Sequence, residues 1–162
     1  MTSKPIILFI INSLAGGGAE RVLTTILGAS GRWTARYDLH LALLDRETAA
    51  YRPPAHVTVH QLDTRNRLGP SIVQLRRLVR RLRPAATLSF LTRANVANAA
   101  AMLGSGRPWL ISERVNTTAH LAQGRGAVAA RAMVRLAYPR ASHVIAVSEG
   151  VVEDLTRNFG VP

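Results

Sequence analysis

Three consecutive glycines, Gly16–Gly18, lie between an apolar run at residues 6–11 and a segment of helical periodicity. Because glycine has no Cβ, such a loop lets the backbone approach a ligand closely. The N-terminus of the next helix, with Glu20 in its first turn, adds a partial positive charge that suits a phosphate. We therefore predict that Gly16, Gly17, Gly18 and Glu20 contact a ligand; a plain flexible turn is the alternative.

The spacing of these glycines matches neither of two common phosphate-binding motifs. The dinucleotide pattern G-x-G-x-x-G needs a third glycine where Arg21 stands, and a Walker loop needs a Gly-Lys-Ser/Thr that does not follow. The loop therefore indicates close approach to a ligand without specifying a nucleotide.

Glu113 is the only acidic residue between Asp63 and Glu149, a stretch that contains 14 arginines. It follows the apolar run at residues 109–112. A carboxylate at the end of a buried strand could accept sugar hydroxyls or act as a general base. The alternative is an ion pair with Arg114 or another nearby arginine that only holds the loop.

Other polar side chains also follow predicted strands. In parallel α/β sheets, ligands bind outside the carboxyl ends of the strands, where the strand order reverses. Thr92 could instead cap the next helix, and Arg93 is either a solvated surface residue or an anion ligand. The predicted cleft residues are Ser89, Thr92, Arg93, Asn95, Arg114, Asn116, Ser148 and Glu149.

The elements that position these residues alternate along the chain. Short apolar runs, the habit of strands buried on both faces, occur at residues 6–11, 39–44, 57–62, 86–90, 109–112 and 144–147. Helical segments are predicted at residues 19–30, 71–82, 94–103, 127–137 and 150–158. Residues 46–55, 65–69 and 123–126 are predicted loops. This alternation predicts one α/β domain over residues 1–162, a Rossmann-like, doubly wound parallel sheet with helices on both faces.

Composition excludes several classes of protein. The chain has no cysteine, so disulfide frameworks and thiolate sites are excluded; its histidines form no H-E-x-x-H pair, and we expect no metal site. No run of 18 apolar residues could span a bilayer. The short run after Lys4 lacks a small-residue cleavage site, which favours a buried strand over a signal peptide.

Charge is the unusual quantity, with 21 basic and 9 acidic residues and a net charge of +12. An amphipathic helix at residues 71–83 concentrates this charge opposite an apolar face. It is either an ordinary surface helix or a basic helix on an anionic membrane. Nucleic acid is not expected, because aromatic residues make up only 5% of the chain. The predicted membrane-facing residues are Arg76, Arg77, Arg80, Arg81 and Arg83.

Four segments together carry a resemblance to a known family. The first strand followed by Gly17-Gly18-Ala19-Glu20-Arg21-Val22-Leu23, then residues 89–95, 111–114 and 146–162, resembles the N-terminal domain of bacterial retaining glycosyltransferases of the GT-B fold, family 4 type. The resemblance covers nearly the whole chain. Many relatives carry a histidine where Glu113 stands, which puts a histidine-based role in doubt.

The resemblance implies an acceptor-side domain facing a separate donor domain across a cleft. The glycine loop would face the donor's phosphates or the transferred sugar. The donor domain is expected to follow Pro162, so this chain alone is expected to be inactive. The whole enzyme would move a sugar from a nucleotide-diphosphate sugar, as co-substrate, to an envelope glycan or lipid-linked acceptor with retention and without a bound cofactor or metal. A cytoplasmic location, peripheral on the inner face of the membrane, is expected.

Two other functions fit the same residues. The glycine loop and the charge would suit a stand-alone module that binds a nucleotide or another anion. The basic helix would suit a membrane-associated interaction domain.

Overall fold

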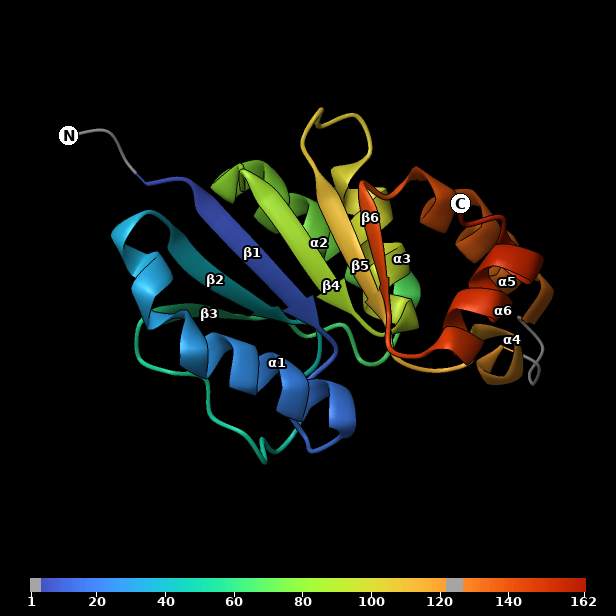
Figure 1. Cartoon of the computed structure of the whole chain (residues 1–162). Helices are drawn as coiled ribbons and strands as arrows, with labels where there is room; N and C mark the ends of the chain where they lie inside the picture. Colours follow the sequence, from blue (N-terminus) through green and yellow to red (C-terminus); the bar gives the residue numbers. More distant parts are fainter. Residues whose placement is uncertain (1–3, 122–126) are drawn as a thin grey trace.

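A six-stranded sheet, parallel throughout, organises the molecule (Figure 1). The structure is a computed structural model and describes residues 4–121 and 127–162. Across the sheet the strands have the order β3-β2-β1-β4-β5-β6. In chain order they are β1 (Ile6–Ile11), β2 (Asp38–Leu43), β3 (Val57–Gln61), β4 (Ala86–Phe90), β5 (Trp109–Glu113) and β6 (His143–Ala146).

Helices connect all successive strands except β2 and β3. The order of strands and the alternation confirm the Rossmann-like, doubly wound fold that the sequence predicts. The helices are α1 (Gly18–Gly28), α2 (Leu68–Leu82), α3 (Thr92–Met102), α4 (Thr117–His120), α5 (Ala127–Ala137) and α6 (Glu149–Phe159), with short 3₁₀ segments η1 (Ala29–Ala35) and η2 (Tyr138–Arg140).

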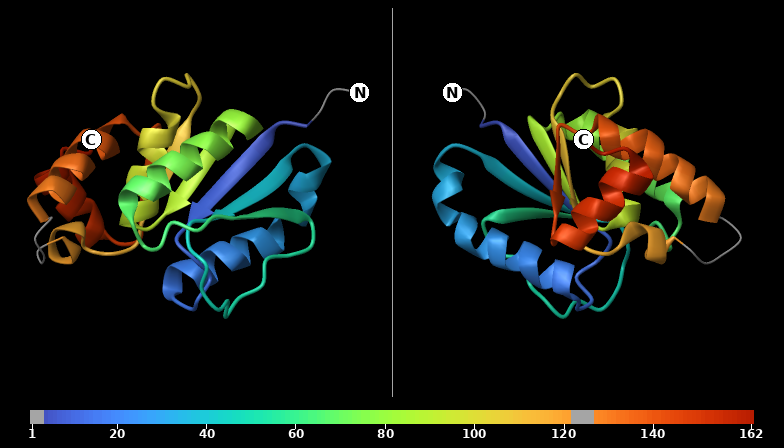
Figure 2. Two further views of the ribbon diagram at one scale, coloured as in Figure 1. Left: turned by 180° about the vertical axis from the view of Figure 1, so that it is seen from behind. Right: turned by 45° about the vertical axis from the view of Figure 1, so that its right-hand side comes forward.

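The two faces of the sheet are covered by different helices, as the two views of Figure 2 show. Phe9 and Ile11 of β1 pack with Leu23 and Leu27 of α1 on one face. Leu8 and Ile10 of the same strand point the other way, into the layer of α2 and α3. The alternation of side chains along a strand therefore explains why β1 is apolar at every position.

A third core joins the last helices to the far edge of the sheet. Ile111 of β5 packs with Val134 of α5, Tyr138, and Leu155 and Phe159 of α6. This group lies beside β5 and β6 in Figure 1. It brings α5 and α6 next to the carboxyl end of β5, where Glu113 stands.

The predicted strands are confirmed to within one residue at each end, and the predicted helices to within three. Helix α2 begins at Leu68, so the predicted loop at residues 65–69 is shorter than expected. The segments η1, α4 and η2 have no counterpart in the prediction. The predicted loop at residues 123–126 lies outside the described residues. Within the described chain, no helix has the length and apolar character needed to cross a bilayer.

Candidate functional site

The strand order reverses between β1 and β4, so the connections that follow these neighbouring strands leave in opposite directions. That divergence creates the crevice in which doubly wound sheets bind their ligands. Two of the predicted segments lie here, the glycine loop after β1 and residues 91–95 after β4. The structure thus brings them to adjacent strand ends.

The glycine loop has the open geometry that its composition predicts. Gly16 has φ +117°, a conformation that favours glycine. Gly17 is the N-cap residue of α1, and its carbonyl accepts a hydrogen bond from Arg21 N at 3.0 Å. The first N–H groups of a helix have no acceptor within the helix, so those of α1 are available to a ligand at the rim of the crevice.

Glu20 lies in the first turn of α1, and its carboxylate folds back over the glycine loop. A Cβ built on Gly17 would overlap a carboxylate oxygen of Glu20, whereas a Cβ on Gly18 would meet no described atom within 4 Å. A side chain at position 17 would therefore meet the carboxylate of Glu20. Gly18 faces open space.

Leu91 begins the segment after β4 and has an unusual backbone. Its φ of 74° and ψ of 147° belong to a region that residues with side chains rarely adopt, at a cost of about 1–3 kcal/mol. Hydrogen bonds from Leu91 N to Ser112 O and from Asn95 N to Leu91 O, at 3.2 and 2.8 Å, hold it there. Strain of this kind concentrates at functional sites, and no sequence pattern could have indicated it, because leucine does not favour this conformation.

Glu113 is fully buried, with 0% of its surface exposed. Its Oε2 accepts hydrogen bonds from Tyr138 OH at 2.5 Å and Thr92 Oγ1 at 3.1 Å, and Asn95 Nδ2 lies at 3.4 Å. Its Oε1 accepts one from the backbone N–H of Arg114 at 3.0 Å. The carboxylate is thus surrounded by neutral donors rather than by an arginine side chain.

The ion-pair alternative for Glu113 is therefore not what the structure shows. In residues 4–121 and 127–162 the ion pairs are Arg93–Asp45 and Arg157–Glu153. In this conformation a ligand cannot reach the carboxylate without displacing its partners. A direct catalytic role for Glu113 stays a prediction.

Tyr138 is a member of this cluster that sequence reasoning missed. It is fully buried, and burial together with the charge of Glu113 raises the pKa of its hydroxyl well above 10. The Tyr138 hydroxyl therefore stays protonated and donates a hydrogen bond to the Glu113 carboxylate. It lies 25 residues beyond Glu113 in the chain, and no local pattern connects the two.

Ser89 and Asn95, predicted to line the cleft, lie inside this layer with 0% exposure. Ser89 Oγ donates to Asn95 Oδ1 at 2.8 Å, and Asn98 Nδ2 donates to Ser89 Oγ at 3.1 Å. Thr87 Oγ1 donates to Asn98 Oδ1 at 2.8 Å. Their side chains touch other parts of the protein, so contact with an acceptor stays a prediction for both.

The prediction that Thr92 caps α3 is wrong. The N-cap residue is Leu91, and Thr92 is the first helical residue. A side chain inside the helix points away from the orphan N–H groups that a cap would serve. Thr92 instead donates its hydroxyl proton to Glu113.

Arg93 is neither a solvated surface residue nor a free anion ligand. Its guanidinium pairs with Asp45, which is 3% exposed, and also donates to Thr64 Oγ1 at 3.1 Å and Ser71 Oγ at 3.2 Å. Burial raises the pKa of Asp45, but the hydrogen bonds from Arg93, Asn66 N and Thr64 outweigh it, so the net pKa lies below the usual value. The pair ties the end of β2 to the start of α3.

Four more predicted residues follow β5 and β6. Arg114 is half-buried beside Glu113, and Asn116 caps α4 by accepting a hydrogen bond from Ala119 N at 2.8 Å. Ser148 is the N-cap residue of α6, with Glu149 in the first turn, and both are exposed. All four stand at the carboxyl edge of the sheet, as predicted, at the ends of strands farther from the reversal point.

A glycosyl transferase 4-like domain model matches residues 13–162, nearly the whole chain and all of the glycine loop. The chain belongs to this family. The resemblance inferred from the glycine loop and the later segments is thereby confirmed.

A curated relative supports the same family. The chain is 26% identical over 163 residues to the N-acetylgalactosamine-N,N'-diacetylbacillosaminyl-diphospho-undecaprenol 4-alpha-N-acetylgalactosaminyltransferase of Campylobacter jejuni subsp. jejuni serotype O:2. The match covers 93% of this chain and 43% of the relative. This family member therefore spans less than half the length of that relative.

Solved structures show the same fold. The lipopolysaccharide outer core galactosyltransferase WaaB in its apo form matches with a TM-score of 0.68 and 13% identity, over 94% of this chain and 42% of that one. Anabaena Alr3699/HepE, in complex with UDP and glucose, matches with a TM-score of 0.65 and 20% identity, over 94% and 40%. At these identities the likeness establishes the fold of the glycosyl transferase 4-like domain.

The five predicted membrane-facing arginines of this domain do not share one surface. Arg77 and Arg81 are exposed on the outside of α2. Arg76, Arg80 and Arg83 line a groove of about 570 Å³ between the C-terminal ends of α2 and α3, which Arg107 also lines. Arg76 additionally donates to Ala100 O at 3.2 Å. The groove lies at the amino edge of the sheet, opposite the glycine loop.

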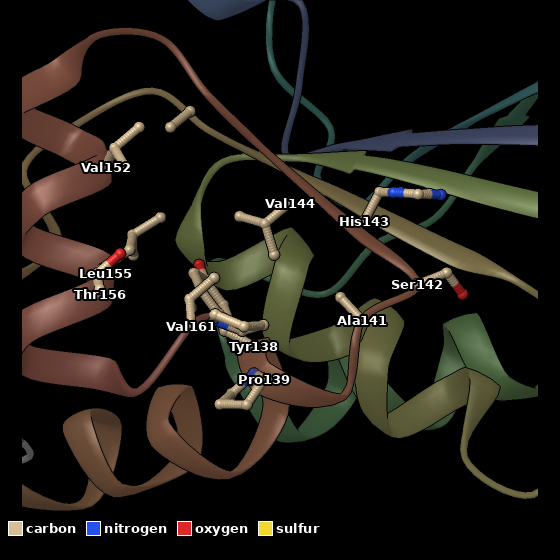
Figure 3. Close-up of a pocket in the computed structure, with 12 residues that line it drawn as sticks. Tyr138, Pro139, Ala141, Ser142, His143, Val144, Val152, Leu155, Thr156 and Val161 are labelled. Atoms are coloured by element: carbon tan, nitrogen blue, oxygen red, sulfur yellow. The ribbon is translucent and has the colours of Figure 1, made fainter.

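The family domain also has a hollow of about 280 Å³ on the outer side of β6 (Figure 3). Tyr138, Val144, Leu155 and Val161 are among its lining residues. It lies at the edge of the sheet, away from the glycine loop. It is therefore separate from the crevice at the strand reversal.

Three of the histidines pair with single polar partners in the structure. His56 and His60 are four residues apart, but His60 is on strand β3. In an extended strand this spacing does not bring two side chains together, as it would on one face of a helix. His60 Nε2 lies 2.8 Å from His40 Nδ1, and His56 Nε2 lies 3.0 Å from Ser30 Oγ. Among the described residues, no three His, Cys, Asp or Glu side chains gather as metal ligands would.

Proposed function

We propose that this chain is the acceptor-side domain of a GT-B glycosyltransferase that moves a sugar from a nucleotide-diphosphate sugar to a lipid-linked or envelope glycan acceptor, with retention. The observation that carries the proposal is the family match over residues 13–162, which includes a glycine loop at the strand reversal. We assign the activity to the whole protein, because the chain spans less than half the length of the Campylobacter relative and of WaaB.

In this proposal the glycine loop serves the donor side of the cleft. The N-terminus of α1 presents N–H groups and a partial positive charge toward the leaving diphosphate. Fixed N–H donors stabilise developing charge without reorganising, which is the main catalytic device of such a site. No bound cofactor is invoked, and the nucleotide sugar is the co-substrate.

The acceptor side is proposed at the ends of β4 and β5. The Campylobacter relative is named for an acceptor built on diphospho-undecaprenol, and WaaB for the lipopolysaccharide outer core. In this chain, a mostly apolar hollow of about 190 Å³ lies beside Thr92 and Arg93, and Val96, Leu121 and Met133 are among its lining residues. Such a surface suits an acceptor that joins an apolar group to a sugar.

The test is transfer by the full-length protein. It would be incubated with a panel of nucleotide sugars and with lipid-linked and soluble glycan acceptors, and products would be identified by mass spectrometry. Transfer with one donor and an unchanged anomeric configuration, read by NMR, is the expected result. Tight nucleotide binding with no transfer or donor hydrolysis would support the stand-alone binding module instead.

A second proposal concerns the membrane: the amino-edge groove contacts anionic phospholipid headgroups. Arg76, Arg80, Arg83 and Arg107 line it, and Leu103 at its rim is 68% exposed. An adjoining hollow of about 390 Å³ adds Lys4 and shares Arg83 and Arg107. Guanidinium groups complement the negative charge of anionic headgroups, and an exposed apolar side chain between them can contact the apolar part of the bilayer.

Charge-matched variants separate this groove from the general positive charge. The groove variant is Arg80→Gln, Arg83→Gln and Arg107→Gln; the control is Arg36→Gln, Arg77→Gln and Arg81→Gln, all exposed positions outside the groove. In sedimentation with phosphatidylglycerol vesicles, the groove variant should lose binding about tenfold and the control much less. Equal losses would show that charge alone is responsible, and equal binding to phosphatidylcholine would rule out headgroup charge.

A further inference from the structure

The connection between β2 and β3 reaches across to the glycine loop and holds it from the side. Leu44 N donates to Ile11 O at 3.1 Å and Asp45 N to Asn12 O at 2.8 Å, which extend the β1–β2 pairing beyond the strands. Farther along, Ala50 N and Tyr51 N both donate to Leu14 O, at 2.8 and 3.3 Å. Residues 44–51, called here the 44–51 segment, therefore run alongside the loop from Ile11 to Gly16.

One side-chain contact links this segment to the loop directly. Ser13 is 5% exposed, and its Oγ donates to Glu47 Oε2 at 2.5 Å. The same Oγ accepts a hydrogen bond from Ala15 N at 3.4 Å. Ser13 thus connects the carboxylate of Glu47 to the backbone immediately before Gly16.

The packing at Gly16 is also close. A Cβ built on Gly16 would lie 3.1 Å from the Cβ of Ala50, which leaves little room for a side chain between the loop and the 44–51 segment. At its other end, the segment is anchored by Asp45, which pairs with Arg93 at the start of α3. The 44–51 segment therefore joins the two predicted segments on either side of the strand reversal.

A run of three glycines has an unusually large conformational entropy, and ordering it on ligand binding costs affinity or rate. Contacts that order the loop beforehand remove part of that cost. We infer that Glu47 is a positioning residue, whose carboxylate acts through Ser13 to hold the glycine loop in the conformation that the donor needs. This inference rests on the proposed function of the loop.

The test compares Glu47→Ala, Ser13→Ala and their double variant in the full-length protein. Each single change should lower kcat/KM for the nucleotide sugar about fivefold, and the double variant should be no worse, because both remove the same contact. Glu47→Gln keeps an oxygen that can accept from Ser13 and should stay within twofold of the original. Arg46→Ala, an exposed neighbour, should leave kcat/KM unchanged. Independent, multiplying losses or an active Glu47→Ala enzyme would overturn the inference.

If Glu47 had only a structural role, Glu47→Ala would lower the melting temperature together with the activity. We expect the melting temperature of Glu47→Ala to change by less than about 2 °C. Hydrogen exchange at Ala15 and residues 16–18 supplies a readout that needs no substrate. Glu47→Ala should speed exchange there several-fold while α2 and α3 are unaffected. If the unmodified protein transfers no sugar, the proposed function fails, and the exchange result still decides whether Glu47 orders the loop.

Discussion

The glycine loop and the Glu113 cluster lie at the same edge of the sheet but are built in opposite ways. In the loop, Ala15, Gly16 and Gly18 are exposed, and the functional groups that we propose there are backbone N–H groups. In the cluster, Glu113, Asn95 and Tyr138 are fully buried and hydrogen-bond one another. The loop exposes its backbone to solvent, whereas the carboxylate of Glu113 receives its hydrogen bonds from other residues of the protein.

The difference separates two tasks that the sequence does not distinguish. A ligand can reach the N-terminus of α1 as it stands, but it cannot reach Glu113 without opening a packed layer. The cluster instead fixes the strained turn at Leu91, since Asn95 and Ser112 belong to both. We expect the buried cluster to set stability and the loop to set activity.

The largest effect should come from Glu113→Ala. This change leaves Tyr138 OH and Thr92 Oγ1 buried with their acceptor gone, and unsatisfied buried donors cost about 1–3 kcal/mol each. We expect a loss of about 4 kcal/mol in the free energy of unfolding, measured by urea denaturation. Glu113→Gln, which keeps one acceptor oxygen, should lose less.

The outcome for Glu113→Gln divides the two roles of this residue. If stability falls and the remaining folded enzyme has an unchanged kcat, Glu113 acts through structure. A large drop in kcat with little loss of stability would show that the carboxylate takes part in the reaction after all, and would break the contrast between the two regions.

The next largest effect concerns the loop, where Gly17→Val should abolish transfer but leave folding intact. Gly17 has φ −143°, which valine tolerates, and its new Cβ would displace only the flexible carboxylate of Glu20. The side chain would occupy the surface at which we propose that the backbone meets the donor. We expect a fall of at least about 100-fold in kcat/KM, equivalent to about 2.7 kcal/mol.

The control for this variant is Gly31→Val, an exposed glycine of η1 with open space at its Cβ position. Transfer and melting temperature should both be close to those of the unmodified protein. Full activity in Gly17→Val would remove this part of the loop from the site.

A smaller effect is expected from Arg93→Gln, which lies between the two regions. It leaves the buried carboxylate of Asp45 without its cation, and we expect a loss of about 2 kcal/mol at pH 7, less than the about 3–5 kcal/mol for a fully buried pair because the Arg93 side chain is 18% exposed. Because the folded-state pKa of Asp45 is lowered, the stability it contributes is present above its unfolded pKa and is lost as pH falls through the folded value.

The pH dependence provides the check on that interpretation. Between about pH 5 and pH 2, the unmodified protein should lose more unfolding free energy than Arg93→Gln, whose Asp45 has a more ordinary pKa. Parallel pH profiles would show that the pair does not stabilise the charged form of Asp45.

The strands of the sheet could be predicted well because a strand that is buried on both faces appears in the sequence as a continuous apolar run. The run at residues 6–11 must be apolar to meet α1 on one side and α2 and α3 on the other. The glycine loop was predictable for a similar reason, since its composition and its place after a strand are local facts.

The partners of the candidate site residues were not predictable in the same way. Arg93 pairs with Asp45, which is 48 residues away in the sequence, and Glu113 accepts a hydrogen bond from Tyr138, which is 25 residues away. Such pairs are set by the register of the strands and the packing of the helices, which a single sequence does not reveal. A polar residue after a strand therefore indicated the edge of the sheet correctly but not whether its side chain faces the crevice or the core.

The smallest expected effect comes from a substitution of Thr92, which tests whether its side chain serves the buried cluster and not the crevice. Thr92→Val keeps the shape of the side chain but removes one of the donors to Glu113 Oε2, while Tyr138 still donates to Oε2 and the backbone N–H of Arg114 to Oε1. We expect a loss of about 1 kcal/mol in unfolding free energy, and Thr92→Ser should restore most of it. The loss should disappear when Thr92→Val is made in the Glu113→Ala background, because the two changes share one hydrogen bond. If it persists there, Thr92 stabilises the start of α3 by another route, and the cluster is less tightly coupled than its distances indicate.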